Sequence, residues 1–362
     1  MESKVQRSLR VILAIAAKDM VDAIKNKSIL SQVFTLAFII VLYRFLPSFD
    51  NWDALPRLAL YDVDHSRLTA VMEDSPSFDL ILTDSQQAME AYVEDQEVVV
   101  LGLVLPSEFD RRINVGEGIA LDGYFVHWAS DSQISEAKTF FEEELSELAG
   151  SPIKIQTEGN IVYTIPDSRG LPFLVSLTVV LVMVISGVFI VPLLMLEEKQ
   201  SKTLDALLVS PADASLVVLG KAVSGSLYCF IGAGAVLALN HNLVTQWGLV
   251  FLTACCGVLF SVGIGLWLGS VFEVKQQLTL WGFVLLNALC VPMFLSLMDD
   301  ILPSAVMTVL HCLPTVALMK LFRISFSDDA SIAVFGPELA LVLVSVGTVL
   351  GAVVWVVRRS DR

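Results

Sequence analysis

The sequence contains several long runs without a charged residue, and these runs constrain the fold more than any other feature. They cover residues 28–43, 170–196, 222–272, 276–298 and 339–357. A helix needs about 20 apolar residues to cross the hydrocarbon core of a bilayer. Only 17% of the residues are charged, against about 25% in ordinary soluble domains. The chain is therefore predicted to be a polytopic membrane protein.

The runs predict six transmembrane helices. The run 222–272 has 51 residues, too many for one helix, and the polar patch Asn240, His241 and Asn242 divides it into spans near 215–239 and 248–271. Each of the other four runs supplies one span, and the first of these is placed at 28–46. Arg44 near its outer end can extend its charged group toward the interface.

The segment 301–326 has two possible readings. Residues 301–319 are uncharged but contain Pro303, His311 and Pro314. A seventh crossing here would put the two basic ends of the chain on opposite sides of the membrane, whereas basic segments stay on the cytoplasmic side. We therefore expect 301–326 to form a pair of short re-entrant or interfacial helices on the outer side.

Both ends of the chain are basic, which predicts that both are cytoplasmic. Residues 1–27 carry six Lys and Arg residues, and the chain ends in a segment with Arg358, Arg359 and Arg362. Residues 1–27 are predicted to form a cytoplasmic interfacial helix, because residues 5–26 have an amphipathic pattern. Its polar side is predicted to carry Lys18, Asp19, Asp22 and Lys25.

One acidic segment interrupts this apolar chain. Residues 47–171 contain 24 acidic and seven basic residues, a net charge of −17, so the rest of the chain carries +2 of the total of −15. Strand and helix patterns alternate in this segment, which predicts an α/β domain. Strands are expected at 57–63, 78–83, 97–105, 119–128 and 152–156, and helices at 66–73, 85–95, 107–113 and 132–149. The chain is thus predicted to be a polytopic α-helical membrane protein of six transmembrane helices. An extracytoplasmic α/β domain is inserted between the first and the second.

The sequence offers no catalytic or metal-binding constellation. Gly220-Lys221 follows Ser215 where a phosphate-binding loop needs its first glycine, and Ala222 stands where that loop needs Ser or Thr. The five cysteines lie in apolar stretches, and the four histidines have no ligand spacing. The acidic total argues against a nucleic-acid partner. We expect a chain that is not an enzyme and that binds no metal or cofactor of its own.

The predicted spans contain almost no ionisable residues, whereas ion-coupled transporters and proton pumps need them as relay sites. If the chain moves a substrate, its energy should come from elsewhere. Asn287, in the middle of a span, is a candidate for lining a pathway. Its other reading is a hydrogen bond between two helices.

The first inner loop has the most informative sequence. Residues 197–209 suit a helix, which Ser210-Pro211 ends. Leu204, Leu207 and Leu208 form a narrow apolar stripe at helical spacing. Such a helix could lie on the membrane or dock into the groove of a partner.

This loop resembles the inner-loop motif of type-2 ABC transporter permeases. The matching residues are Glu197-Glu198-Lys199-Gln200-Ser201-Lys202-Thr203-Leu204-Asp205-Ala206-Leu207-Leu208-Val209-Ser210-Pro211, followed by Gly220-Lys221. Lys202 replaces the usual glycine and Asp205 the usual glutamate, and neither change breaks a helix. Residues 1–27 resemble the elbow helix of this family. The acidic segment resembles the large outer domain of its multidrug and sodium-efflux members, and the stretch around Pro314 and Arg323 resembles its re-entrant pair.

The resemblance implies the permease subunit of an exporter in a prokaryotic plasma membrane. Such permeases pair with a second copy or a paralogue and bind a separate cytoplasmic ATPase, which carries the ATP and magnesium. Residues 197–211 would be the coupling helix. Leu204, Leu207 and Leu208 would anchor it, and its other contact residues would be Glu197, Glu198, Lys199, Lys202, Thr203, Ser210 and Pro211.

The apolar pathway favours an amphiphilic substrate, drug-like or lipid-like, and membrane lipids are expected partners. The alternative is a membrane-anchored receptor or sensor whose outer α/β domain binds a ligand. That reading leaves the inner-loop helix and the outer re-entrant pair unexplained.

Overall fold

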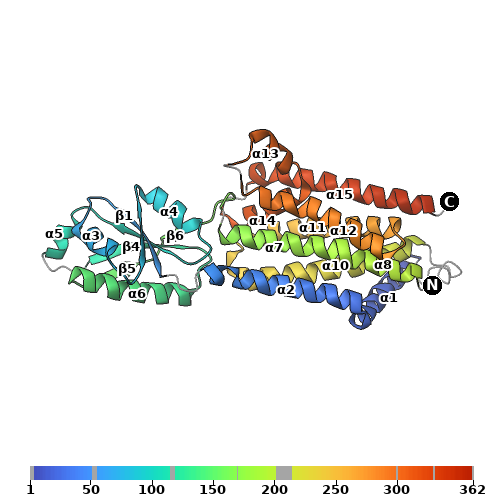
Figure 1. Cartoon of the computed structure of the whole chain (residues 1–362), viewed down its shortest axis with the longest axis horizontal. Coiled ribbons are helices and arrows are strands. Elements are labelled where there is room, and N and C mark those ends of the chain that lie inside the picture. The colour runs from blue at the N-terminus through green and yellow to red at the C-terminus, as the bar shows by residue number, and fades with distance from the viewer. Residues whose placement is uncertain are drawn as a thin grey trace.

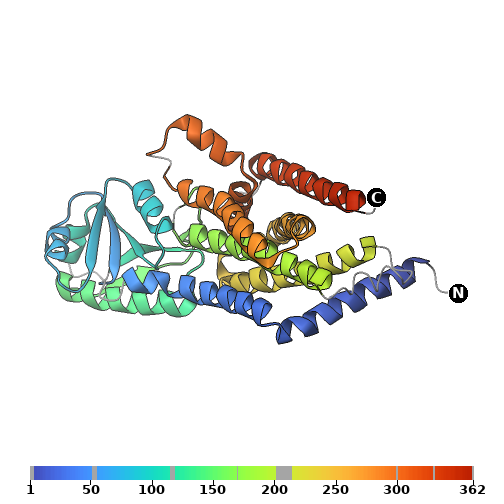
Figure 2. The same ribbon diagram turned by 45° about the vertical axis from the view of Figure 1, so that its right-hand side comes forward.

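The computed structural model describes residues 4–50, 55–114, 119–168, 170–200, 214–298, 301–328 and 331–360. The molecule is elongated, with a sheet-containing unit at one end and a bundle of long helices extending from it (Figures 1 and 2). The first and last helices both reach the end of the bundle that lies farthest from the sheet (Figure 1).

The sheet unit follows the predicted alternation of strands and helices. Its elements are β1 (Arg57–Asp62), α3 (Arg67–Glu73), β2 (Asp79–Thr83), α4 (Gln86–Glu94), β3 (Leu101–Leu105), α5 (Phe109–Asn114), β4 (Ile119–Val126), α6 (Asp131–Ala149), β5 (Ile153–Gln156) and β6 (Ile161–Val162). The strand order is β2-β1-β3-β4-β5, and β6 pairs with β4. Only the β3–β4 pair is antiparallel among these described strands.

The two faces of this sheet pack against different partners. Leu58 and Leu60 of β1 point into a core with Phe141 and Leu145 of α6. Ala59 between them belongs instead to the core that continues into the helical bundle, together with α4. Because side chains alternate along a strand, one face completes the sheet unit and the other joins it to the bundle.

The strand predicted at 97–105 begins four residues late, at Leu101. Leu58 of β1 pairs with Leu101, and the described part of β1 begins at Arg57. Residues 97–100 do not join the strand, although β4 on the other side of β3 continues to Val126. Their apolar character reflects packing instead, since Val100 is fully buried in the bundle-side core.

The helices outside the sheet unit are α1 (Lys4–Lys25), α2 (Lys27–Asp50), α7 (Leu171–Ile185), the π-helix η1 (Ser186–Ile190), α8 (Val191–Gln200), α10 (Ala214–Leu239), α11 (Trp247–Val271), α12 (Lys275–Leu295), α13 (Ser304–His311), α14 (Pro314–Phe326) and α15 (Ile332–Ser360). The 3-10 turn η2 (His241–Leu243) separates α10 from α11, at the predicted polar patch.

Five of these segments are long and apolar enough to cross a membrane: Leu171–Glu197, Leu216–Leu239, Trp247–Val271, Lys275–Leu295 and Ile332–Val356. The described apolar part of α2, Lys27–Leu42, is shorter. Helices α13 and α14 pass the same test together but are bent by 81°. The count is therefore five to six, which confirms a helical membrane protein of about the predicted number of spans.

The segment from α7 through η1 to α8 forms the centre of the bundle together with α11. A Cβ atom on Gly265 of α11 would lie 2.1 Å from the carbonyl oxygen of Gly187, and one on Gly269 would lie 2.8 Å from Cβ of Met195. The Gly265-x-x-x-Gly269 spacing thus lets two backbones approach closely, as small residues do in membrane helix pairs. Large apolar side chains are exposed on the outer helices, including Phe34 and Phe38 of α2 and Phe283 of α12.

Candidate functional site

A buried ion pair joins α1 to α10 at the end of the bundle far from the sheet. The ammonium of Lys221 lies 2.6 Å from Oδ1 of Asp19, and the two side chains are 2% and 4% exposed. The hydroxyl of Ser224 donates to the other carboxylate oxygen of Asp19 at 3.0 Å. Both charges are thus neutralised away from water, and this three-residue cluster is called the inner joint below.

The sequence of α10 allows this close contact. A Cβ atom on Gly220 would lie only 2.6 Å from Cγ2 of Ile15 in α1, so glycine is needed where the helices cross. The predicted position of Asp19 on the exposed polar side of the first helix is wrong, because the side chain is buried. The amphipathic pattern assumes that the polar side of the helix faces water. Helix α1 instead packs along α10, and this contact buries Asp19.

The inner joint lies close in sequence to the predicted coupling segment. Glu197 is half-buried near the end of α8, and α8 extends through Glu198 and Lys199 to Gln200. Helix α10 begins at Ala214, and Lys221 follows about two turns later. The remaining predicted contact residues lie outside the described residues: Lys202, Thr203, Leu204, Leu207, Leu208, Ser210 and Pro211.

A second polar cluster joins the sheet unit to the opposite end of the bundle. Arg323 of α14 is 9% exposed and donates from Nη2 to the carbonyl oxygen of Ser168 at 2.8 Å. Its guanidinium also lies over the ring of Phe173, 5.8 Å from the centroid. The carbonyl oxygen of Phe326 accepts hydrogen bonds from the hydroxyls of Thr164 and Thr245. The segment between β6 and α7 is thereby fixed to α14.

Glu94 at the end of α4 belongs to the same cluster. Glu94, Thr164, Ser168, Arg323 and Phe326 are together called the outer junction below. Its carboxylate accepts a hydrogen bond from the backbone N–H of Ile165 at 2.7 Å, and its carbonyl oxygen lies 3.4 Å from the hydroxyl of Ser168. Burial raises the pKa of Glu94, while the Ile165 hydrogen bond and the nearby Arg323 act in the opposite direction. The Glu94 carboxyl group is therefore positioned by hydrogen bonding within the protein and is largely removed from solvent.

His127, just after β4, makes a third contact between the sheet unit and the bundle. Its Nε2 lies 3.1 Å from the carbonyl oxygen of Leu243, in the turn between α10 and α11. The ring stacks on Tyr163, with 5.4 Å between the centroids. Burial lowers the pKa of His127, and the Leu243 carbonyl and Asp328 oppose this shift. The folded protein thus favours the neutral imidazole.

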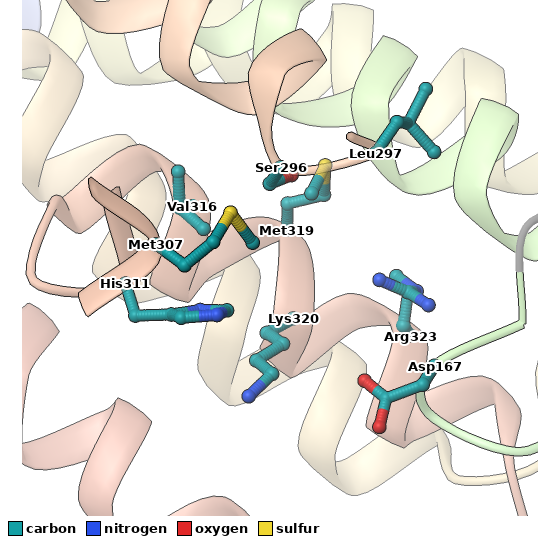
Figure 3. Close-up of a pocket in the computed structure, with 9 residues that line it drawn as sticks. All are labelled: Asp167, Ser296, Leu297, Met307, His311, Val316, Met319, Lys320 and Arg323. Atoms are coloured by element: carbon teal, nitrogen blue, oxygen red, sulfur yellow. The ribbon is translucent and has the colours of Figure 1, made fainter. Parts of the chain in front are cut away.

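A cavity of about 210 Å3 lies beside the outer junction (Figure 3). It is lined by Asp167, by Ser296 and Leu297 after α12, by Met307 and His311 of α13, and by Val316, Met319, Lys320 and Arg323 of α14. The ammonium of Lys320 also lies 3.3 Å from the carboxylate of Glu338 in α15. The cavity therefore touches three bundle helices or their ends and the linker to the sheet unit.

Asn287 is exposed on α12, and its side-chain amide donates to the carbonyl oxygen of Phe283 in the same helix at 2.8 Å. The structure thus satisfies this amide within one helix, and a role in lining a pathway stays a prediction. No group of three or more His, Cys, Asp or Glu residues suited to a metal ion occurs among the described residues.

Sequence analysis missed the partner of Lys221 and the roles of Glu94 and His127. Asp19 and Lys221 are separated by about 200 residues, so no local spacing connects them. Arg323 was noted only as part of the re-entrant resemblance. The sequence offered one signal for the inner joint, which is that Lys221 directly precedes an apolar run. Charged residues are typical of the ends of spans, so this signal does not identify the partner of Lys221.

Comparison with known families decides the class of protein. The model of the ABC-2 family transporter protein matches residues 27–356. The chain belongs to the ABC-2 transporter family. The probable multidrug ABC transporter permease YbhR of Escherichia coli strain K12 is 23% identical over 261 residues, which are 68% of this chain and 70% of that protein. YbhR of Escherichia coli O157:H7 matches to the same extent.

Family membership, the similarity to YbhR and the apolar helices together support a membrane-embedded transporter permease subunit. The predicted resemblance is therefore confirmed. An ABC ATPase is the general partner that an ABC-2 permease implies.

The inner joint of this ABC-2 permease predicts an asymmetric response to mutation. Asp19→Asn removes the negative charge that lies 2.6 Å from the buried ammonium of Lys221, which should destabilise the fold by about 3–5 kcal/mol. The double variant Asp19→Leu/Lys221→Met removes both charges and should recover most of that loss. Unfolding of the purified protein in a neutral detergent measures both effects.

The matched control is Asp79→Asn in the sheet unit. Asp79 lies 3.9 Å from Arg57, and its side chain is 62% exposed, so its loss should change stability by less than about 1 kcal/mol. Equal effects of Asp19→Asn and Asp79→Asn would contradict the burial of the inner joint.

The depressed pKa of His127 predicts a loss of stability in acid. The unfolded chain protonates this imidazole near pH 6.5, whereas the folded chain does so only at a lower pH. Its contribution is therefore complete above about pH 6.5 and is lost as the pH falls toward the folded pKa. Between pH 7.5 and 5.5, His127→Gln should reduce the fall in the thermal midpoint, and His241→Gln, at an exposed position, should not. An unchanged pH dependence in His127→Gln would disprove this role.

Proposed function

We propose that this ABC-2 permease is the membrane subunit of an ATP-driven exporter that works with a separate ATPase and with a second permease copy or paralogue. The observation that carries the proposal is the inner-loop sequence 197–211, which begins in the last residues of α8 and precedes α10 in a chain of this family. The printed description of YbhR as a probable multidrug permease agrees with this assignment.

Coupling would act through the two helices that flank the inner loop. Helix α8 continues through η1 into α7, the most deeply packed span, while α10 is fixed to α1 by the inner joint. A displacement of residues 197–211 would therefore move the centre of the bundle and the elbow helix together. Glu197, Glu198, Lys199 and Lys202 would orient the segment, and Leu204, Leu207 and Leu208 would anchor it. ATP and magnesium would be held by the partner.

The proposed orientation puts the sheet unit outside the cell and both termini in the cytoplasm. Its support is that α1 begins and α15 ends at the same end of the bundle, opposite the sheet (Figure 1). We assign α2 as the first span and α13–α14 as a re-entrant pair. The contacts of Phe326 with Thr164 and Thr245 place the end of α14 on the sheet side, where α15 also begins.

The proposed substrate is amphiphilic, drug-like or lipid-like. Helices α2, α12 and α15 expose large apolar side chains, such as Phe38, Trp281 and Val344, and a path along such surfaces suits molecules that partition into lipid. A ligand-binding receptor remains the second reading. It explains neither the inner-loop sequence nor the family match.

The proposed coupling predicts that one charge on the leucine stripe abolishes binding of the ATPase. Leu207→Glu places a carboxylate where the partner groove should be apolar, and co-purification of the cognate ATPase should be lost. Ala206→Glu adds the same charge on the opposite side of the predicted helix and should leave the complex intact. Undiminished binding by Leu207→Glu, with normal membrane insertion, would refute the coupling assignment.

The proposed orientation predicts which end of the molecule an impermeant thiol reagent reaches. Ser132 in α6 of the sheet unit and Glu273 between α11 and α12 are both exposed. Lys275, two residues after Glu273, bonds to Ser28 at the start of α2, at the end of that helix away from the sheet unit. In a cysteine-free background, Ser132→Cys should react in intact cells and Glu273→Cys only after the membrane is opened. The reverse labelling pattern would overturn the orientation.

A further inference from the structure

The cavity beside the outer junction has two chemically different walls (Figure 3). Leu297, Met307, Val316 and Met319 supply apolar and thioether surface, while Lys320, Arg323 and His311 bring nitrogen groups to the same hollow. Its volume of about 210 Å3 is below the roughly 300–1,000 Å3 of pockets that enclose drug-sized ligands. The cavity suits a small polar head with a short apolar stem.

The lining charges favour an anion. Lys320 and Arg323 are basic side chains, and Asp167 is the one carboxylate among the lining residues. Groups of the protein already accept some of the hydrogen bonds that these two side chains can donate. Glu338 lies 3.3 Å from Lys320, and the carbonyl of Ser168 binds Arg323. Arg323 also lies near Glu94. Two fixed cations oppose a metal ion, although two thioethers and an imidazole are soft ligands.

His311 supplies an unsatisfied group. Its Nδ1 is buried and has no hydrogen-bond partner among the described residues. Buried polar atoms in native proteins are almost always paired. An oxygen atom of a bound molecule would accept a hydrogen bond from this nitrogen when Nδ1 carries the proton. Lys320 lies on α14, beyond the bend that separates it from His311 of α13, but lines the same cavity and would donate to the same head group.

We propose that this cavity binds a phosphate or carboxylate group, with Lys320 and His311 as its ligands and Met307 and Met319 beside the apolar stem. The bound group would touch α13, α14, the end of α12 and the linker at Asp167, so it would hold these four segments in one arrangement. Such an oxyanion can come from the head of an acidic amphiphile or from a free anion.

The test measures binding to the purified full-length protein in a neutral detergent by calorimetry. The probes are hexyl phosphate, inorganic phosphate and hexyl trimethylammonium. Hexyl phosphate should bind and hexyl trimethylammonium should not. Binding of hexyl phosphate alone identifies an amphiphile head as the ligand, whereas equal binding of inorganic phosphate identifies a free anion. Equal binding of the cationic probe would overturn the proposal.

Variants of the lining separate binding from folding. Lys320→Met should weaken hexyl phosphate binding by about tenfold, the loss expected for one charge-assisted hydrogen bond, and His311→Ala should also weaken it. Lys320→Arg should retain binding. Glu338→Gln removes the internal competitor for Lys320 and should tighten binding, a gain that a damaged fold would not produce. Lys154→Met, at an exposed position in β5, is the neutral control.

Unchanged affinity in both Lys320→Met and His311→Ala, or weaker binding in Glu338→Gln, would overturn the proposed ligand set. Thermal midpoints of the ligand-free variants show whether each has folded.

Discussion

The close approach of two backbones at the centre of the bundle is the contact on which the other helices depend. A Cβ atom on Gly187 would lie 2.2 Å from the carbonyl oxygen of Ser261, and one on Gly265 would lie 2.1 Å from that of Gly187. Lipid is as apolar as the side chains it meets, so membrane helices associate through close packing and polar contacts. The paired α7–η1–α8 and α11 thus form the scaffold on which α10, α14 and α15 pack.

Around this scaffold, the described buried charges lie at the two ends of the bundle. Asp19 and Lys221 neutralise each other at the inner joint, and Arg323 is bound by the Ser168 carbonyl at the outer junction. Burial of a charge is costly unless it is paired and hydrogen-bonded. Each polar cluster therefore fixes the geometry of one particular contact: α1 with α10 at one end, and α14 with the linker of the sheet unit at the other.

Sequence patterns predicted most elements of the fold because those patterns arise from local physics. Apolar run lengths gave α7–α8, α10, α11 and α12 nearly to the residue, and the split at Asn240 coincides with the turn η2. Helix α15 begins at Ile332, earlier than the uncharged run 339–357. Glu338 interrupts the uncharged sequence but not the helix, because its carboxylate pairs with Lys320. The start of β3 at Leu101 was not predicted, because the apolar residue Val100 before it packs into the bundle-side core, and no single segment encodes that packing.

The candidate sites divide in the same way. The inner-loop motif at 197–211 could be recognised in the sequence because its residues are neighbours in the chain. The inner joint, the outer junction and the cavity beside it were not, because Asp19 and Lys221, or Glu94 and Ile165, are far apart in the chain.

By itself, the sequence determined that the chain is a helical membrane protein with an acidic α/β insertion, because hydropathy and charge patterns are properties of neighbouring residues. Its inner-loop motif added the resemblance to ABC-2 permeases. Only the tertiary structure decided which charges are buried together, which face of the sheet meets the bundle and where a cavity forms. These features depend on how segments that are far apart in the chain pack together, and local sequence patterns do not specify that packing.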